Sequence, residues 1–207
     1  MVDAIAEQKN GAVAVLPATP AGVITAKQLE AIAKIANDGA GLVKLTSMQR
    51  IAILVKKEQI DIARNQLAEA GLKVGVVGKR EVWNPMGCTG ALCKYSRQDA
   101  LSDAVAIADL AGIKTPRQVK IGISGCPNSC AWSKVVDIGL IGNKDGYDIY
   151  IGGDAGRSPH IGQKLKTVPK EKAVSAVKEI VDRFNTYGKD GEHIYQVIER
   201  VGLDAFR

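Results

Sequence analysis

Over roughly the first 78 residues, short apolar runs alternate with stretches in which apolar residues recur every three or four positions. A run of four to six apolar residues is typical of a strand, and the longer period is typical of a helix with one buried face. The runs predict strands over residues 12–16, 42–45, 51–55 and 72–77, and the periodic stretches predict helices over 26–37 and 60–70. Thr25 stands where a helix N-cap is expected, and Gly71 stands where a helix ends.

This order, strand–helix–strand repeated twice, is typical of a ferredoxin-like split βαβ unit of the α+β class. Residues 1–11 lack such a pattern and are expected to form a flexible lead-in, so the ferredoxin-like half-domain spans 12–78. The character changes near residue 78, and a second unit is expected over 79–207. In it, the pattern predicts helices over 98–111, 131–135, 170–187 and 192–201, strands over 119–123, 137–141 and 147–151, and a glycine-rich loop over 152–157.

Composition describes an ordinary globular protein of 207 residues, 46% hydrophobic and 24% charged. No apolar run approaches the roughly 20 residues of a membrane span. No basic and then apolar segment opens the chain, so we expect a cytoplasmic protein. The net charge of +6 comes from scattered lysines and arginines, which disfavours nucleic acid and suits a polyanionic cofactor or a small anionic substrate.

All four cysteines fall into two close pairs, Cys88 with Cys93 and Cys126 with Cys130. Four thiolates are what a 4Fe–4S cluster needs, one for each iron. A structural zinc site also uses four cysteines, and the spacings C-x4-C and C-x3-C leave it open. The usual two-residue zinc knuckle is absent, however, and a core of this size needs no metal to fold. Disulfides are disfavoured in a reducing cytosol. The cysteines therefore favour an iron–sulfur protein.

Several segments resemble the sirohaem-dependent nitrite and sulfite reductase family. Residues 125–130, Gly-Cys-Pro-Asn-Ser-Cys, and 137–142, Asp-Ile-Gly-Leu-Ile-Gly, are similar to its cluster segment and following strand. Residues 88–90, Cys-Thr-Gly, resemble the first cysteine segment of the nitrite reductase branch, and 45–49, Leu-Thr-Ser-Met-Gln, resemble a segment of the ferredoxin-like half. Larger members hold two copies of this unit. One copy resembles the small, assimilatory-type sulfite reductases.

The resemblance implies a 4Fe–4S cluster and sirohaem, both bound by residues 79–207. It makes Cys88, Cys93, Cys126 and Cys130 the cluster ligands, with the Cys130 thiolate also bound to the haem iron. It implies further cofactor contacts at Gly153, Arg157, Asn128 and Arg117. Sirohaem is a polycarboxylate, which agrees with a mildly basic protein. Because the chain has no flavin, nicotinamide or second cluster motif, its electrons are expected from a separate donor such as a ferredoxin.

The chain departs from the family pattern where substrate cations are expected. Met48 replaces an arginine, Gln118 replaces the first of two lysines, and the first cysteine pair is one residue shorter than usual. Strand alternation places Lys120 on the face of Gln118 and Arg50 on the face of Met48. Arg80 lies just before the cysteine loop. Lys120, Arg50 and Arg80 are therefore the predicted substrate-binding residues, with a solvated surface charge as the alternative for each.

The leading functional hypothesis is the six-electron reduction of sulfite to sulfide. Nitrite reduction to ammonia is the nearest alternative, since residues 88–90 favour it while the single copy favours sulfite. A non-catalytic electron carrier, or a subunit of a larger redox complex, is an alternative of another class, kept open by Met48. A zinc-stabilised interaction module is a third. One copy of a unit that relatives duplicate also predicts a twofold homodimer.

Overall fold

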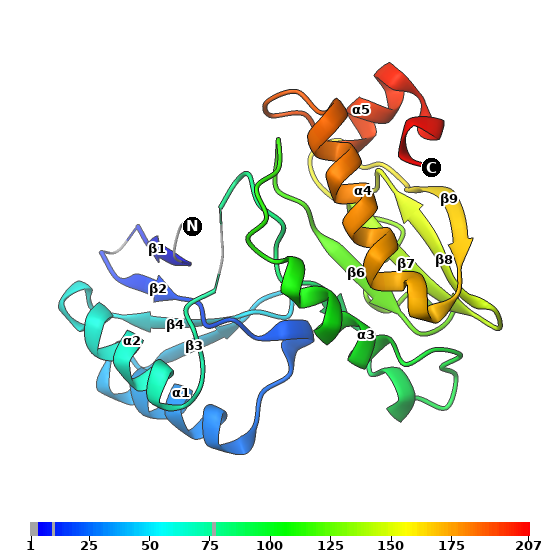
Figure 1. The fold of residues 1–207 in the computed structure, drawn as a ribbon. Coiled ribbons are helices and arrows are strands. Elements are labelled where there is room, and N and C mark those ends of the chain that lie inside the picture. The colour runs from blue at the N-terminus through cyan, green and yellow to red at the C-terminus, as the bar shows by residue number, and fades with distance from the viewer. Residues whose placement is uncertain (1–3, 10, 76–77) are drawn as a thin grey trace. The chain divides into compact units, whose positions relative to one another are not determined.

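The computed structural model describes residues 4–9, 11–75 and 78–207, and the chain divides into two compact units, 1–78 and 79–207 (Figure 1). The first unit ends at residue 78, the position near which the character of the sequence changes. Each unit has its own mixed architecture of helices and one sheet, so the predicted α+β class is confirmed.

The sheet of the first unit is antiparallel and has the strand order β1-β2-β4-β3. Its elements are β1 Ile5–Glu7, β2 Val13–Val15, α1 Ala26–Asp38, β3 Leu42–Leu45, β4 Ile51–Val55 and α2 Ile60–Glu69. Central strand β4 pairs with β2 from Val13↔Val55 to Val15↔Ile53. The side chains that these strands bury meet Ile32 of α1 and Leu67 of α2, which forms the core of this unit.

Local sequence explains where helix α1 begins. Thr25 Oγ1 accepts a hydrogen bond from Gln28 N at 3.2 Å, and Gln28 Oε1 accepts one from Thr25 N at 2.9 Å. This reciprocal capping box satisfies two backbone donors that the first turn leaves without helical partners.

Two expectations for the first unit need correction. Strand β1 lies inside the predicted flexible lead-in, because its backbone pairs with β2 from Ile5↔Val15 to Glu7↔Val13. The strand predicted over 72–77 is reduced to a single bridge between Pro17 and Val74, and residues 76–77 lie outside the described residues.

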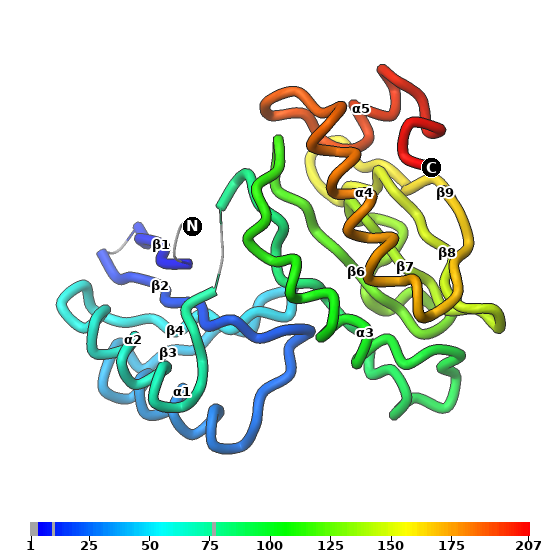
Figure 2. Tube along the Cα trace, viewed as in Figure 1, coloured from blue at the N-terminus to red at the C-terminus, as the bar shows by residue number. Residues whose placement is uncertain are grey.

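The sheet of the second unit has the order β5-β6-β7-β8-β9, parallel from β5 to β7 and antiparallel from β7 to β9. Its strands are β5 Met86–Gly87, β6 Ile121–Ser124, β7 Ile138–Asn143, β8 Gly146–Ile151 and β9 Gln163–Val168, and its helices are α3 Ala100–Ile107, α4 Ala173–Tyr187 and α5 Ile194–Val201 (Figures 1 and 2). Helix α3 packs on β5 and β6 and contacts α4. Every residue of β6 is buried, as expected of a parallel strand covered on both faces.

Three features of this unit differ from the sequence expectations. The helix predicted over 131–135 is a series of turns. Strand β5 is too short for any periodicity. Edge strand β9 reads Gln-Lys-Leu-Lys-Thr-Val, in which only Leu165 and Val168 are buried and no regular alternation marks a strand. In the part of the chain that the structure describes, no helix is long and apolar enough to cross a membrane.

Candidate functional site

The two cysteine pairs follow neighbouring parallel strands. Strand β5 ends one residue before Cys88 and pairs with β6, which ends shortly before Cys126. Parallel neighbours deliver their carboxyl ends to the same edge of a sheet, so the two loops meet there. The contact is direct, since Gly125 N donates a hydrogen bond to Cys88 Sγ at 3.1 Å and Cys88 N donates to Ile123 O at 3.0 Å. An amide aimed at a thiolate sulfur is typical of iron–sulfur sites.

The loop after Cys93 folds back onto the same edge. Gly125 O accepts hydrogen bonds from Arg97 N at 2.7 Å and from Gln98 N at 3.2 Å. A Cβ on Gly125 would stand 2.0 Å from Ser96 Oγ, so only glycine permits this approach. The segment that carries Cys93 is thereby tied to the segment that carries Cys126.

All four cysteines are free thiols, which excludes the disulfide alternative. Cys126 is buried, Cys130 is exposed, and Cys88 and Cys93 are half-buried. Across residues 4–9, 11–75 and 78–207, no three or more cysteine, histidine or carboxylate side chains gather closely enough to hold a single metal ion. Asn128, a predicted cofactor contact, is exposed between Cys126 and Cys130.

The chain after Cys130 lies against the sheet along three glycines. An added Cβ would stand 2.3 Å from Ala131 O at Gly122, 1.5 Å from Ser133 O at Gly139 and 2.7 Å from Lys134 O at Gly153. Gly122 and Gly139 are partners across β6 and β7. The predicted cofactor residue Gly153 therefore packs against backbone, and its neighbour Asp154 lines a groove. Residues 131–135 therefore form turns packed closely against backbone instead of the predicted helix. The pattern of apolar residues does not reveal packing of this kind.

Two buried serines fix the ends of the second cysteine loop. Ser124 Oγ and Ser133 Oγ are hydrogen-bonded at 2.8 Å, and Ser124 Oγ also accepts a bond from Ala131 N at 3.0 Å. Inside the loop, Ser129 and Trp132 have positive φ angles of 54° and 57°. The backbone therefore turns tightly on both sides of Cys130, and the serine pair closes the loop at its base.

A groove of about 470 Å³ lies entirely within the second unit. It is lined by Arg117, Gln118, Lys120, Asp154, Gly156, Arg157, Ser158, His193 and Tyr195. The structure thus brings together three cations that the sequence singled out, Lys120, Arg117 and Arg157. Gln118 and Lys120 line the same groove, as strand alternation predicted. Three basic side chains around one hollow form a site for an anion.

Arg117 has unused capacity in this groove. Its Nη1 donates to Gly191 O at 3.4 Å, while its Nε is buried and has no hydrogen-bond partner within the described chain. A buried guanidinium nitrogen without an acceptor is costly, and an anionic oxygen in the groove would satisfy it. Beside it, burial and the positive charge of Arg117 lower the pKa of His193. This ring is therefore held in its neutral form.

Two buried carboxyl groups lie close to the groove cations. Asp137 is 5% exposed, and its Oδ2 accepts a hydrogen bond from Lys120 N at 2.8 Å. Burial raises the pKa of Asp137 to about 7, with Asp154 adding to the rise and Lys120 opposing it. Asp154 lines the groove and is 8% exposed. No sequence motif marks these carboxyl groups, His193 or Tyr195 as parts of one site, because they come from separate segments.

Arg80 does not line the groove. Its Nη1 forms an ion pair with Asp190 Oδ1 at 2.6 Å, and both side chains are mostly exposed. The position just before the cysteine loop was the whole basis for the prediction, and the structure shows that a different partner takes the charge.

Arg50 belongs to the first unit and lines a separate cavity of about 490 Å³ there. It is 6% exposed, and desolvation lowers its pKa to about 10. Residues 46–49 form a turn, with Gln49 at φ 54°, and Thr46 N donates to Arg50 O at 2.8 Å. Strand alternation therefore does not run through Met48, and the argument that placed Arg50 on its face is wrong.

Comparison with known protein families covers nearly the whole chain. Residues 78–207 match the nitrite and sulphite reductase 4Fe-4S domain, and residues 6–70 match the nitrite/sulfite reductase ferredoxin-like half domain. The chain belongs to the nitrite and sulfite reductase family. The ferredoxin-like match falls in the first structural unit and the 4Fe-4S match covers the second. This agreement confirms the resemblance drawn from the cysteine segments.

Relatives of the chain include a protein of similar length. An assimilatory-type sulfite reductase of Nitratidesulfovibrio vulgaris is 32% identical over 99% of this chain and 94% of its own length. The large subunit of the NADH nitrite reductase of Escherichia coli is 32% identical over 73% of this chain but only 18% of its own. A dissimilatory sulfite reductase structure superimposes with a TM-score of 0.84 at 16% identity, over 94% of this chain and 68% of that one, and shares the fold.

Membership makes this chain an oxidoreductase and implies a 4Fe–4S cluster with sirohaem, which confirms the cofactor prediction. The residues present fit both groups. Four free thiols stand on two loops tied at one sheet edge, one of them with an amide donated to its sulfur. Arg117, with its unsatisfied Nε, lines a basic groove together with Lys120 and Arg157, which suits the carboxylates of sirohaem or an oxyanion.

Proposed function

We propose that this chain reduces sulfite to sulfide with six electrons. The observation that carries the proposal is the basic groove, in which Arg117, Lys120 and Arg157 surround one hollow in the unit that also holds the four cysteines. Arg117 and Arg157 also suit the carboxylates of sirohaem, so Lys120 is the groove cation that an electron carrier would not need. The similar length of the assimilatory-type sulfite reductase favours sulfite over nitrite.

In this proposal Cys88, Cys93, Cys126 and Cys130 would hold the 4Fe–4S cluster, and Cys130 would also hold the sirohaem iron. Cys130 suits the second role because it is the exposed member of the set and lies on a tightly turned loop. When bound, sirohaem and the cluster would relay the electrons of the separate donor and provide the iron at which the anion is reduced. Gly153 supports this loop through Lys134, while Asn128 lies on its exposed side.

The groove residues bind and orient the anion. Lys120 is fixed at the start of β6, where its backbone N donates to Asp137. Arg117 offers a planar fork, one nitrogen of which is already held by Gly191 O. Arg157, on the exposed loop after Gly156, is the third basic side chain that lines the groove. Sulfite reduction consumes protons as well as electrons, and the Asp137 carboxyl, with its pKa near 7, is a proton donor beside Lys120.

Nitrite reduction to ammonia is the second candidate, because residues 88–90, Cys-Thr-Gly, resemble the nitrite branch and nitrite reductases are among the relatives. Both anions suit the same groove. The electron donor is a separate protein of the ferredoxin type. Both proteins act in the cytoplasm. A twofold homodimer is proposed because larger family members duplicate this unit. Light scattering of the cofactor-loaded protein tests that point, and a fully active monomer would contradict it.

Substitution of Lys120 by alanine tests the function. We expect the KM for sulfite to rise by about 10- to 100-fold, since a lost charge-assisted hydrogen bond costs about 1.5–3 kcal/mol. Steady-state rates with reduced viologen measure this, and the visible spectrum should stay unchanged because Lys120 is no ligand. Lys144→Ala, which removes an exposed lysine on the β7–β8 turn, is the control.

The nitrite alternative is separated by running the same assay with both anions. A specificity constant for nitrite above that for sulfite would replace sulfite as the substrate. If Lys120→Ala and Arg117→Ala both reduce the two anions like the parent, the groove is not the substrate site. A parent protein that carries both cofactors but reduces neither anion would support the carrier hypothesis. Metal analysis that finds zinc and no iron would contradict the cofactors.

A further inference from the structure

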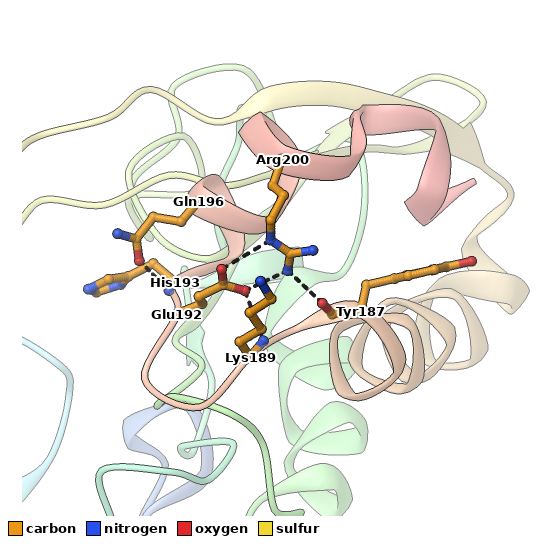
Figure 3. A network of polar contacts seen from close by, with 6 residues as sticks. All are labelled: Tyr187, Lys189, Glu192, His193, Gln196 and Arg200. Carbon is orange, nitrogen blue, oxygen red and sulfur yellow. Dashed lines mark hydrogen bonds and ion pairs between the residues drawn. The ribbon is translucent and has the colours of Figure 1, made fainter.

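The loop between α4 and α5 is closed by one arginine. Figure 3 shows Arg200 reaching from α5 to Glu192, with Nε bonded to Oε1 at 3.1 Å and Nη2 bonded to Oε2 at 2.7 Å. The same Nη2 donates to Tyr187 O, the last residue of α4, at 2.7 Å. Glu192 Oε2 also accepts from Lys189 N at 2.8 Å. One guanidinium therefore joins the end of α4, the loop and α5.

The opposite side of this loop is bonded to the segment that leads into the groove. Gly191 N donates to Pro116 O at 3.0 Å, and Gly191 O accepts from Arg117 Nη1 at 3.4 Å. Asp190 takes the ion pair from Arg80 at 2.6 Å. Gly191 has a φ of 82°, and nothing lies within 4 Å of the place where a Cβ would be, so glycine is needed for its conformation. The loop therefore holds the acceptor that orients Arg117.

The loop also delivers two groove residues. His193 follows Glu192 directly, and its backbone N is bonded to Gln196 Oε1 at 2.8 Å, which fixes the start of α5 (Figure 3). Tyr195 comes one residue into α5, where its ring stacks on His160 at 3.7 Å and on His193 at 5.2 Å. Both His193 and Tyr195 line the groove. A displacement of residues 188–193 would therefore move one wall of the groove and release the Arg117 guanidinium together.

We propose that Arg200 and Glu192 are positioning residues for the groove, because their ion pair holds Gly191 where it orients Arg117. The proposal deepens, and rests on, the function proposed for the same site. Neither residue lines the groove, so both act through Arg117 and His193. The pair is joined by two hydrogen bonds in one plane. It therefore fixes the orientation of the loop in addition to neutralising the charge of Glu192.

The ion pair of Arg200 holds the loop between α4 and α5 more strongly than the ion pair of Arg80 does. The Arg200–Glu192 pair is 33% and 21% exposed and has two parallel bonds plus a third to Tyr187 O. The Arg80–Asp190 pair has a single close contact and is 61% and 68% exposed, so water screens it. Loss of Arg80 should therefore change the groove much less than loss of Arg200.

The test compares Arg200→Gln with Arg207→Gln in the cofactor-loaded protein. Arg207 forms an ion pair with Asp204 at 3.0 Å in the same terminal region but makes none of the loop contacts, so it is the matched control. We expect Arg200→Gln to raise the KM for sulfite by about tenfold and to change kcat less, since a small misplacement of a binding group weakens substrate positioning. Arg200→Lys, which restores one donor, should recover part of the KM.

A second readout does not depend on the reaction. The pH dependence of His193 acylation by diethyl pyrocarbonate, followed by peptide mass spectrometry, reports the pKa of that ring. Arg117 helps to lower this pKa, so displacement of the loop should shift the midpoint of His193 reactivity to higher pH. The His193 midpoint in Arg207→Gln, in which the loop contacts are intact, serves as the reference.

The outcomes separate the two proposals. A shifted His193 midpoint with a raised KM supports both, and a shifted midpoint with an unchanged KM supports the positioning role while it contradicts the proposed function of the groove. If Arg200→Gln matches Arg207→Gln in both measurements, the positioning role is overturned. Should Arg200→Gln fail to fold, Glu192→Gln removes the charge and keeps the shape, and the same comparisons decide.

Discussion

Asp137 should make the stability of this protein fall as pH rises through neutrality. Its carboxyl is 5% exposed, and burial raises its pKa from 3.8 to about 7. Between these two values the folded protein holds a proton that the unfolded chain releases. The contribution of Asp137 to the unfolding free energy is therefore most favourable below about pH 4 and decreases up to about pH 7. Lys120 and Asp154 are the charged neighbours that tune this value.

The magnitude follows from the two pKa values. One pKa unit corresponds to about 1.4 kcal/mol, so the full difference between the protonated and ionised states is about 4 kcal/mol. Part of it is already lost by pH 5, because the unfolded carboxyl titrates near pH 4. We therefore expect Asp137 to reduce the unfolding free energy by about 2–3 kcal/mol between pH 5 and pH 8.

Asp137→Asn isolates this contribution. Asparagine keeps an oxygen that accepts the Lys120 N–H bond but cannot ionise. Urea unfolding of parent and variant at pH 5, 6, 7 and 8 should show the parent losing about 2–3 kcal/mol relative to the variant across that range. Asp109→Asn, at an exposed position on the turn after α3, controls for the loss of a surface charge. If the parent and Asp137→Asn change in parallel with pH, the carboxyl is not buried as the structure shows.

Four other substitutions test the cysteine loops and the fold. Cys130→Ser should remove the coupled haem spectrum together with the cluster, whereas Cys88→Ser should chiefly damage the cluster; two normal visible spectra would refute the ligand assignment. Gly139→Ala should destabilise the second unit by about 3 kcal/mol or more in urea unfolding, because its Cβ would stand 1.5 Å from Ser133 O. Thr25→Ala should cost about 1 kcal/mol by the same measurement, through loss of the α1 cap, and an unchanged midpoint would show that the capping box contributes nothing.

The sequence alone determined the elements whose causes are local. Helix α1 begins after Thr25 as expected, because the cap and the buried face lie within one short segment. Strands β3 and β4 have the predicted bounds, since a short run made up mainly of apolar residues needs no distant partner to be recognised. The four cysteines also predicted an iron–sulfur cluster, because their residue type and spacing can be read from the sequence without knowledge of the fold.

Tertiary structure decided the rest, because the deciding contacts join residues far apart in the chain. The groove unites 117–120, 154–158 and 193–195, and no periodicity within one segment announces that meeting. Alternation held at Gln118 and Lys120 but failed at Met48, where a turn interrupts the strand. Arg80 was assigned by sequence proximity to the cysteines, yet its charge is taken by Asp190, 110 positions later. A charge acts on whatever the fold places beside it, and that neighbour is set by packing.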